Sequence, residues 1–400
     1  MVIKIAEPDT NDTAQHWHQH PIFELAFRPF FLLAAFSSAL SLALWILLLN
    51  GHMLIGHSGL SPHVWHAHEM LIGFGTTVAV GFILTAVQTW TGQPSIKGKA
   101  LAALVALWCL TRIAFYINTA ESAVLATILQ GLWWLAVVII YSKLVFAAQN
   151  RRNYIFIALL SVMGLVNLLI LGGDLTANSG LALHLSRAMV LLFTIMMALV
   201  GGRVIPFFTV RGAQTAPIEC PAWINRLVGP LAIATTAAFI ASYFVNTYQL
   251  VPLSLMLLGL FHLLRLAYWR SINTLKVPLL WSLHISYLLM ALGLIALGAS
   301  YYLTSLSFSN ALHIITIGAI GLMIFAMMSR VSLGHTGRTL IIKPIISIAF
   351  ILLVAATLIR TFLPLADALL AWNLSAGLWI ITSLIFLAVY LPILSSKRQS

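Results

Sequence analysis

Four of the 13 histidines in this 400-residue chain stand where they can serve as metal ligands. Each lies at one end of a long apolar stretch: His66, His68, His184 and His313. Neutral imidazole is a common ligand of haem iron and of copper. Histidine is also costly inside a bilayer, so these rings are expected to face the interior of a helix bundle. The pattern therefore predicts haem or copper chemistry near one end of such a bundle.

The spacing of His66 and His68 suits two cofactors better than one. About 200° separates residues two apart around an ideal helix, so one metal ion does not easily bind both. Glu69 and Met70 follow His66 by three and four residues and share its face. A His66–Met70 pair suits Cu(I), and Glu69 is interpreted either as a proton carrier or as a group that orients a metal ligand.

Each histidine also has a simpler interpretation. A single imidazole at a membrane interface often only hydrogen-bonds a lipid headgroup, a carbonyl or water. The recurrence of a histidine at the same depth on helices four apart favours metal binding over this alternative. The histidines near the chain start and in the longest loop are interpreted as solvated: His16, His18, His20, His52, His57 and His63.

Arg187 lies three residues after His184 in the same apolar stretch. An arginine within a membrane span needs a partner, and the candidates are a haem propionate, Glu69, Asp174 or a backbone carbonyl. Methionine pairs at 196–197 and 327–328 resemble a copper path, but such pairs in buried helices are more often packing residues.

The elements that would hold these residues are membrane-spanning helices. Hydrophobic residues make up 61% of the chain and charged residues 8%, and the mean hydropathy is +1.01. Soluble proteins carry roughly 25% charged residues, so most of this surface must face lipid. The net charge of +12 is scattered between apolar stretches, which argues against nucleic-acid binding. Cys109 and Cys220 form no CxxC motif, so no zinc ribbon, disulfide framework or c-type haem is expected.

The expected fold is an all-α polytopic membrane protein with about twelve spans of roughly 20 residues each. The predicted spans are 28–49, 68–90, 100–117, 122–145, 154–172, 181–205, 227–245, 249–268, 278–302, 310–329, 344–362 and 370–394. With the N-terminus in the cytoplasm, 18 of the 21 lysines and arginines fall in cytoplasmic segments, and the other three, Arg112, Arg187 and Arg360, fall within spans. The expected organisation is a cytoplasmic segment (1–26), one twelve-helix domain (27–395) and a cytoplasmic tail (396–400).

A weak internal repeat relates two of the histidine-bearing spans. His68 and Gly92 are separated by 24 residues, as are His313 and Gly337. A threonine precedes each of these glycines, and each histidine is followed five residues later by another glycine. The pattern indicates a structural repeat, with chance similarity as the alternative.

Several motifs are similar to those of the NnrS family. They are Phe27-Arg28-Pro29-Phe30-Phe31, Trp65-His66-Ala67-His68-Glu69-Met70, Thr89-Trp90-Thr91-Gly92, Gly201-Gly202-Arg203-Val204-Ile205-Pro206 and Ser329-Arg330-Val331-Ser332-Leu333-Gly334-His335-Thr336-Gly337-Arg338. The resemblance implies a multi-pass protein of the bacterial inner membrane that contains haem b and copper and takes part in the response to nitric oxide (NO).

Histidines on the second, sixth and tenth of twelve helices also resemble the catalytic subunit of haem-copper oxidases and nitric oxide reductases, as an analogy of fold. In that superfamily the second and tenth helices hold the low-spin haem, which suggests His68 and His313 as axial ligands here. His66 and His184 would then approach a second metal, with Arg187 beside a propionate. The paired histidines typical of that superfamily's seventh helix are missing, which argues against a standard binuclear site.

The leading hypothesis is that the protein binds NO, and reduces it, at a haem near the periplasmic side. Reduction would need electrons from a quinol or a redox protein, and Glu69 would pass protons. A transporter of copper, haem or a small nitrogen species is the main alternative, because twelve helices with internal repeats are common among transporters. A haem-based sensor or assembly factor is a third, although no soluble output domain accompanies the helices.

Overall fold

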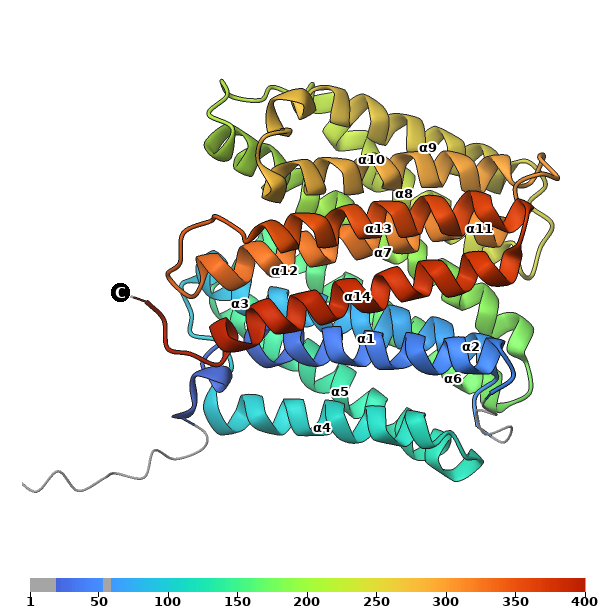
Figure 1. Ribbon diagram of the computed structural model, residues 1–400, viewed down its shortest axis with the longest axis horizontal. Coiled ribbons are helices and arrows are strands. Elements are labelled where there is room, and N and C mark those ends of the chain that lie inside the picture. Colours follow the sequence, from blue (N-terminus) through green and yellow to red (C-terminus); the bar gives the residue numbers. More distant parts are fainter. Residues whose placement is uncertain (1–18, 53–58, 400) are drawn as a thin grey trace, which may run out of the picture.

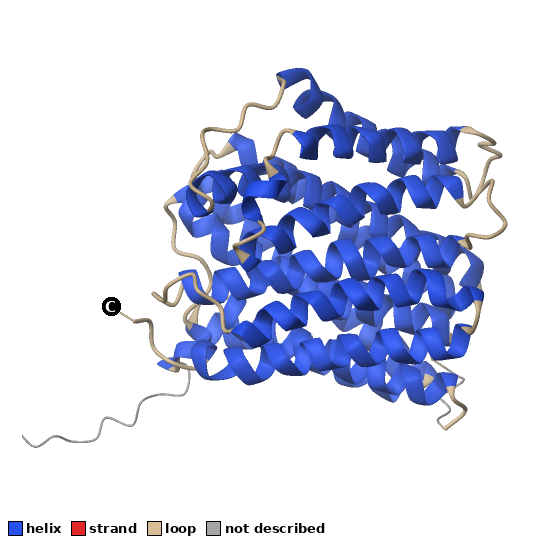
Figure 2. Ribbon diagram, turned by 45° about the horizontal axis from the view of Figure 1, so that its top comes forward, coloured by secondary structure: helices blue, strands red, loops and turns tan. Residues whose placement is uncertain are grey.

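The long apolar runs fold as helices throughout residues 19–52 and 59–399, the part of the chain that the computed structural model describes (Figures 1 and 2). Within these residues, twelve helical stretches are long and apolar enough to cross a membrane. The predicted all-α polytopic fold is confirmed. The interpretations of His16, His18 and His57 concern residues outside the described part.

In chain order the elements are η2 (Pro21–Phe23), α1 (Phe27–Leu49), α2 (Pro62–His68), η3 (Glu69–Thr76), α3 (Thr77–Thr91), α4 (Gly98–Ile117), α5 (Ala120–Ala147), η4 (Arg151–Asn153), α6 (Tyr154–Leu175), α7 (Ser179–Gly212), α8 (Ala222–Ala241), α9 (Leu250–Ala267), η5 (Ser271–Thr274), α10 (Pro278–Ala299), α11 (Phe308–His313), η6 (Ile314–Gly321), α12 (Leu322–Gly334), α13 (Pro344–Phe362), η7 (Leu363–Leu365) and α14 (Ala368–Leu394). The second span consists of α2, η3 and α3, and the tenth consists of α11, η6 and α12.

Two spans are longer than their hydropathy predicts. The second begins at Pro62 rather than at residue 68, because proline fits the first turn of a helix, where its missing N–H is not needed. His66 and His68 therefore lie in the second turn and do not open the helix. The sixth span, α7, continues past Pro206 to Gly212. Membrane helices tolerate an internal proline where neighbouring groups satisfy the freed carbonyls.

Most consecutive spans pack side by side, and α1 packs against α14, so the first and last spans are neighbours. The helix α7 contacts α2, α10 and η6 in addition to its neighbours in sequence. The second and sixth spans are the most deeply buried of the twelve. The helices that carry His68 and His184 thus lie inside the bundle, and the outer spans shield them from lipid.

The predicted internal repeat is supported by three successive spans. The second, third and fourth spans cover Pro62–Thr91, Gly98–Ile117 and Ala120–Ala147, and the tenth to twelfth cover Phe308–Gly334, Pro344–Leu365 and Ala368–Leu394. The corresponding starts are 246 to 248 residues apart by these bounds.

Both repeats contain a π-helix at the same place. The π-helix η3 begins directly after His68, and η6 begins directly after His313. In η3 the wider turn leaves carbonyls that threonines satisfy, since Thr76 Oγ1 donates to Leu71 O and Thr77 Oγ1 to Ile72 O, each five residues back. The sequence match between the repeats therefore reflects a shared, uncommon backbone feature.

Both described chain ends lie at the same end of the bundle (Figure 1). The buried side chain of Arg28 at the start of α1 donates to Leu394 O (3.1 Å) and Ser396 O (2.6 Å), which fixes the end of α14 beside it. An even number of spans requires this arrangement. The opposite end of the bundle, where α2 and α11 begin, is called the distal end below.

Candidate functional site

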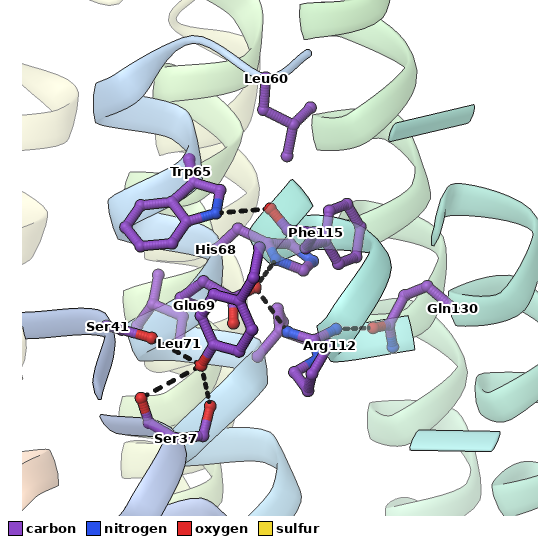
Figure 3. Close-up of polar contacts among 12 residues, drawn as sticks. Ser37, Ser41, Leu60, Trp65, His68, Glu69, Leu71, Arg112, Phe115 and Gln130 are labelled. Atoms are coloured by element: carbon purple, nitrogen blue, oxygen red, sulfur yellow. Dashed lines mark hydrogen bonds and ion pairs between the residues drawn. The ribbon is translucent and has the colours of Figure 1, made fainter. Parts of the chain in front are cut away.

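A chain of buried polar side chains links α2, η3, α4 and α5 near the distal end (Figure 3). Glu69 Oε1 lies 3.0 Å from His68 Nδ1 and 2.7 Å from Arg112 Nη1. Arg112 Nη2 in turn donates to Gln130 Oε1. The side chains of His68 and Glu69 are fully buried, and that of Arg112 is 3% exposed. An ion pair and a histidine are therefore held together inside an apolar bundle.

The arrangement determines how His68 presents its ring. A carboxylate beside an arginine stays ionised, so Glu69 accepts a hydrogen bond from His68 Nδ1–H. The lone pair of the neutral ring then lies on Nε2, which is buried and has no partner among the described residues. Metal-ligating histidines typically donate their other N–H to a carboxylate in this way. His68 is thus oriented as a metal ligand is.

Aromatic side chains seal this network. The ring of Phe115 lies 4.5 Å from that of His68, and Trp65 Nε1 donates to Phe115 O at 3.0 Å. Gly73 provides the space for the ion pair, because a Cβ there would lie 3.0 Å from both Arg112 Nη1 and Glu69 Oε2. Gly73, the glycine five residues after His68 in the internal repeat, is therefore explained by the space that this ion pair needs.

A second group of side chains surrounds His66 and His313. Arg360 on α13 lies close enough to act electrostatically on both rings, and the two rings act on one another. The ring of His66 stacks on Trp45 at 4.4 Å, and its buried Nδ1 has no partner among the described residues. His313 Nδ1–H donates to Ser309 O at 2.6 Å, which leaves its Nε2 as the acceptor.

The neighbours of the predicted ligands differ from one histidine to the next. His313 is within electrostatic reach of His66, whereas the contacts of His68 are with Glu69 and Phe115. The assignment of His68 and His313 as one axial pair stays a prediction.

The other predicted site residues lie apart from these groups. His184 hydrogen-bonds Phe239 O at 2.8 Å and stacks on that phenylalanine ring. Arg187 is exposed, with its guanidinium 5.0 Å from the ring centre of Phe308. Neither acidic candidate is its partner, since Glu69 pairs with Arg112 and Asp174 accepts from Ser61. Met70 is half-buried in η3, where the π-helical turn changes its register with His66.

The described donors do not form a metal-binding cluster. Within the described residues, no three His, Cys, Asp or Glu side chains converge as a metal-binding group. Haem needs only one or two protein ligands, since the porphyrin supplies four. His68 offers one such donor, its unpartnered Nε2. The proposed copper ligands His66, His184 and Met70 are not gathered at one point by any contact described above.

An apolar cavity lies between the second, sixth and tenth spans. Its volume is about 80 Å³, and it is lined by side chains and glycines that carry no polar side-chain group: Gly75, Val78, Ala79, Phe82, Phe193, Met196, Met197, Val200, Ile320, Met323, Ile324 and Met327. Three of the four methionines interpreted as packing residues thus border a cavity between the inner helices.

Comparison with known protein families identifies the chain. The model of the family described as NnrS protein matches residues 21–398, nearly the whole sequence. The chain belongs to the NnrS family. No curated protein matches it. Membership connects the chain with the nitric oxide response in general and confirms the resemblance carried by the motifs.

Several residues of the NnrS motif at 329–338 contact the two described chain ends. Thr336 O accepts from Gln399 N at 2.9 Å, and Arg338 donates to Ser396 Oγ at 2.9 Å. His335 packs against Phe27, with ring centres 5.7 Å apart, and burial and the charge of Arg398 lower its pKa. These contacts assign the motif a structural role at the chain ends.

Sequence reasoning did not assign roles to Arg112, Gln130 or Arg360. The signal was present in part, because an arginine within a span needs a partner. The partners themselves lie on other helices and are set by packing. Among the other described histidines, His284 is hydrogen-bonded through both ring nitrogens, to Thr209 and Ser271. His262 Nδ1 contacts Tyr287 Oη, and its buried Nε2, like that of His68, has no partner among the described residues, but no carboxylate orients its ring.

Proposed function

We propose that this NnrS protein binds nitric oxide at a haem held by His68 and thereby protects the cell from it. The observation that carries the proposal is the buried Nε2 of His68, which has no partner while Glu69 and Arg112 fix the opposite side of the ring. A free ring nitrogen in a membrane interior is costly unless a ligand or metal occupies it.

The roles of the neighbouring residues follow from their contacts. Glu69 holds the tautomer and the orientation of His68, and Arg112 keeps Glu69 ionised. A haem bound there supplies an iron to which NO binds. The charged carboxylate near His68 increases electron donation by the ring, which lowers the reduction potential of a metal that it ligates. In this role Glu69 is a positioning residue rather than a proton carrier.

The apolar cavity supports entry of NO from the bilayer. NO is small and apolar, so it partitions into lipid and into spaces lined by hydrocarbon. The 80 Å³ cavity lies beside η3 and η6, the segments that follow His68 and His313. NO then reaches the distal end without crossing an aqueous surface.

The experiment uses the full-length protein purified without oxygen, with haem and copper quantified per chain. We expect b-type absorbance bands that change when NO is added, and loss of these bands in His68→Ala. His313→Ala tests whether the second ligand comes from the tenth span. His52→Ala removes an exposed histidine and is the matched control. If His68→Ala retains wild-type haem content and an unchanged spectrum, the proposed site is wrong.

An NO electrode separates binding from reduction. Binding alone consumes about one NO per haem and then stops, whereas continued consumption that requires an added quinol or redox protein identifies an oxidoreductase. Copper content that tracks activity in His66→Ala and His184→Ala would extend the site to that metal. We place the protein in the bacterial inner membrane with both termini in the cytoplasm, which fusions of a periplasmic reporter enzyme to the chain end test.

A further inference from the structure

Arg360 is a buried cation with no acidic partner among the described residues. The residue is 8% exposed, and it donates from Nη1 to Asn310 Oδ1 (2.7 Å) and from Nη2 to Ser309 Oγ (3.1 Å). Both of these partners are neutral. The three ion pairs of the described chain involve Arg28, His68 and Arg112. A guanidinium removed from water in this way lacks the counter-charge that normally accompanies it.

The internal repeat shows what is missing. In the first repeat, Arg112 on the third span pairs with Glu69, the residue directly after the histidine of the second span. In the second repeat, Arg360 lies on the eleventh span, which corresponds to the third span, and the residue directly after His313 is Ile314. The arginine is kept, and the carboxylate that would neutralise it is absent.

Two further buried nitrogens without a partner in the described part of the chain belong to residues near Arg360. The guanidinium of Arg360 lies 5.8 Å from the ring centre of Trp372, whose buried Nε1 has no partner among the described residues. An indole N–H only donates, so it calls for an acceptor. The unpartnered Nδ1 of His66 lies within electrostatic reach of Arg360. Of the five N–H groups of Arg360, two are used and three remain.

We propose that Arg360 and Trp372 form a binding site for a planar oxyanion of single charge. The flat, forked guanidinium matches the geometry of two oxygens on one trigonal centre, and the indole supplies a further donor. The chemistry is shared by nitrite and nitrate in solution and by a haem propionate. We favour nitrite or nitrate, the oxidised relatives of NO. That choice rests on the proposed function, whereas the anion site itself rests only on the unneutralised arginine.

The decisive variant is Asn310→Asp. It is isosteric and places a carboxylate oxygen where Arg360 already finds an acceptor, so it supplies the missing charge from within the protein. Thermal unfolding of the full-length protein is followed in a chloride-containing buffer free of carboxylates while sodium nitrite or nitrate is added. Binding to the folded state raises the unfolding midpoint in proportion to site occupancy. Arg360→Gln and Trp372→Phe remove the donors, and Arg187→Gln, an exposed arginine, is the control.

We expect nitrite to raise the midpoint of the wild type and of Arg187→Gln. In Asn310→Asp and Arg360→Gln the affinity should fall on the order of ten- to a hundredfold, the effect of losing a charge-assisted hydrogen bond. Without nitrite, Asn310→Asp should unfold no lower than the wild type, which excludes misfolding as the cause. An Asn310→Asp protein that responds to nitrite as the wild type does would overturn the proposal.

The two sources of the oxyanion give different results. If nitrite has no effect on the wild type but Arg360→Gln and Asn310→Asp contain less haem per chain, the occupant is a propionate. If nitrite stabilises the wild type and haem content is unchanged in the variants, the occupant is free in solution. If neither quantity changes, no oxyanion binds there. None of these measurements uses NO, so they can fail while the proposed function stands, and the reverse also holds.

Discussion

Replacing Glu69 in its buried pair with Arg112 should lower the free energy of unfolding more than replacing Arg112. Glu69→Gln keeps the shape but removes the negative charge, and Arg112 cannot lose its own charge to compensate. Removing one partner of a buried ion pair costs about 3–5 kcal/mol. The two contacts of Glu69, at 3.0 Å and 2.7 Å, give a similar figure, since a hydrogen bond to a charged group contributes about 1.5–3 kcal/mol.

Arg112→Gln should cost less. The carboxylate of Glu69 then still contacts His68, which can take up a proton and supply the missing positive charge. In the double variant Glu69→Gln/Arg112→Gln no charge remains, so its cost should fall short of the sum of the two single costs by about 2–3 kcal/mol. The order Glu69→Gln, then Arg112→Gln, with strong non-additivity, is the signature of a coupled buried pair.

The assay is reversible unfolding in mixed micelles with increasing sodium dodecyl sulfate, followed by helix content. Glu121→Gln, an exposed acid in the first turn of α5, is the matched control and should stay within about 0.5 kcal/mol of the wild type. The reasoning fails if Glu69→Gln costs no more than Glu121→Gln. It also fails if the two single costs simply add, because the two residues would then act independently.

Three further outcomes are expected. Gly73→Ala should destabilise by about 1–3 kcal/mol, because the added methyl group crowds Arg112 and Glu69, whereas Gly172→Ala, where a Cβ meets nothing within 4 Å, should be neutral or stabilising in the same titration. Ala79→Leu narrows the apolar cavity and should slow NO uptake several-fold at the electrode with haem content unchanged; equal rates would exclude the cavity as a route. The pKa of His335 is lowered in the folded chain, so the unfolded chain takes up a proton first as the pH falls below about 6.5, and stability should decline between pH 7 and pH 5. His335→Gln should flatten that decline, and an unchanged slope would show that other groups cause it.

The sequence predicted the spans well because hydropathy is a local property. It misplaced the start of the second span, since the residues from Pro62 to Ala67 include two histidines and a proline that lower the hydropathy of a helical segment. The repeat could also be recognised from the sequence, because Gly73 and Gly318, which both permit close packing, each follow a histidine by five residues. These features depend on residues near one another in the chain.

Which residues lie beside each histidine could not be predicted from such local features. The argument from ideal helix geometry assumed about 100° per residue, which holds for His66 and His68 within α2 but not for Met70, because the π-helix η3 starts directly after His68. The partners of Glu69 and of His66 come from α4 and α13, and only tertiary packing brings those helices into contact. Candidate ligands can be named from the sequence, whereas the neighbours of each side chain depend on tertiary packing.

The two repeats differ by charge balance, and that difference separates their chemistry. In the first, Glu69 neutralises Arg112, so the pair carries no net charge to attract an anion, and the unpartnered Nε2 of His68 has the lone pair that suits a metal. In the second, Asn310 stands in hydrogen-bond contact with Arg360 but carries no charge, so a positive charge persists beside His66 and His313. A single carboxylate therefore decides which kind of ligand each copy attracts. Asn310→Asp and Glu69→Gln exchange these conditions, and together they ask whether charge alone distinguishes the two sites.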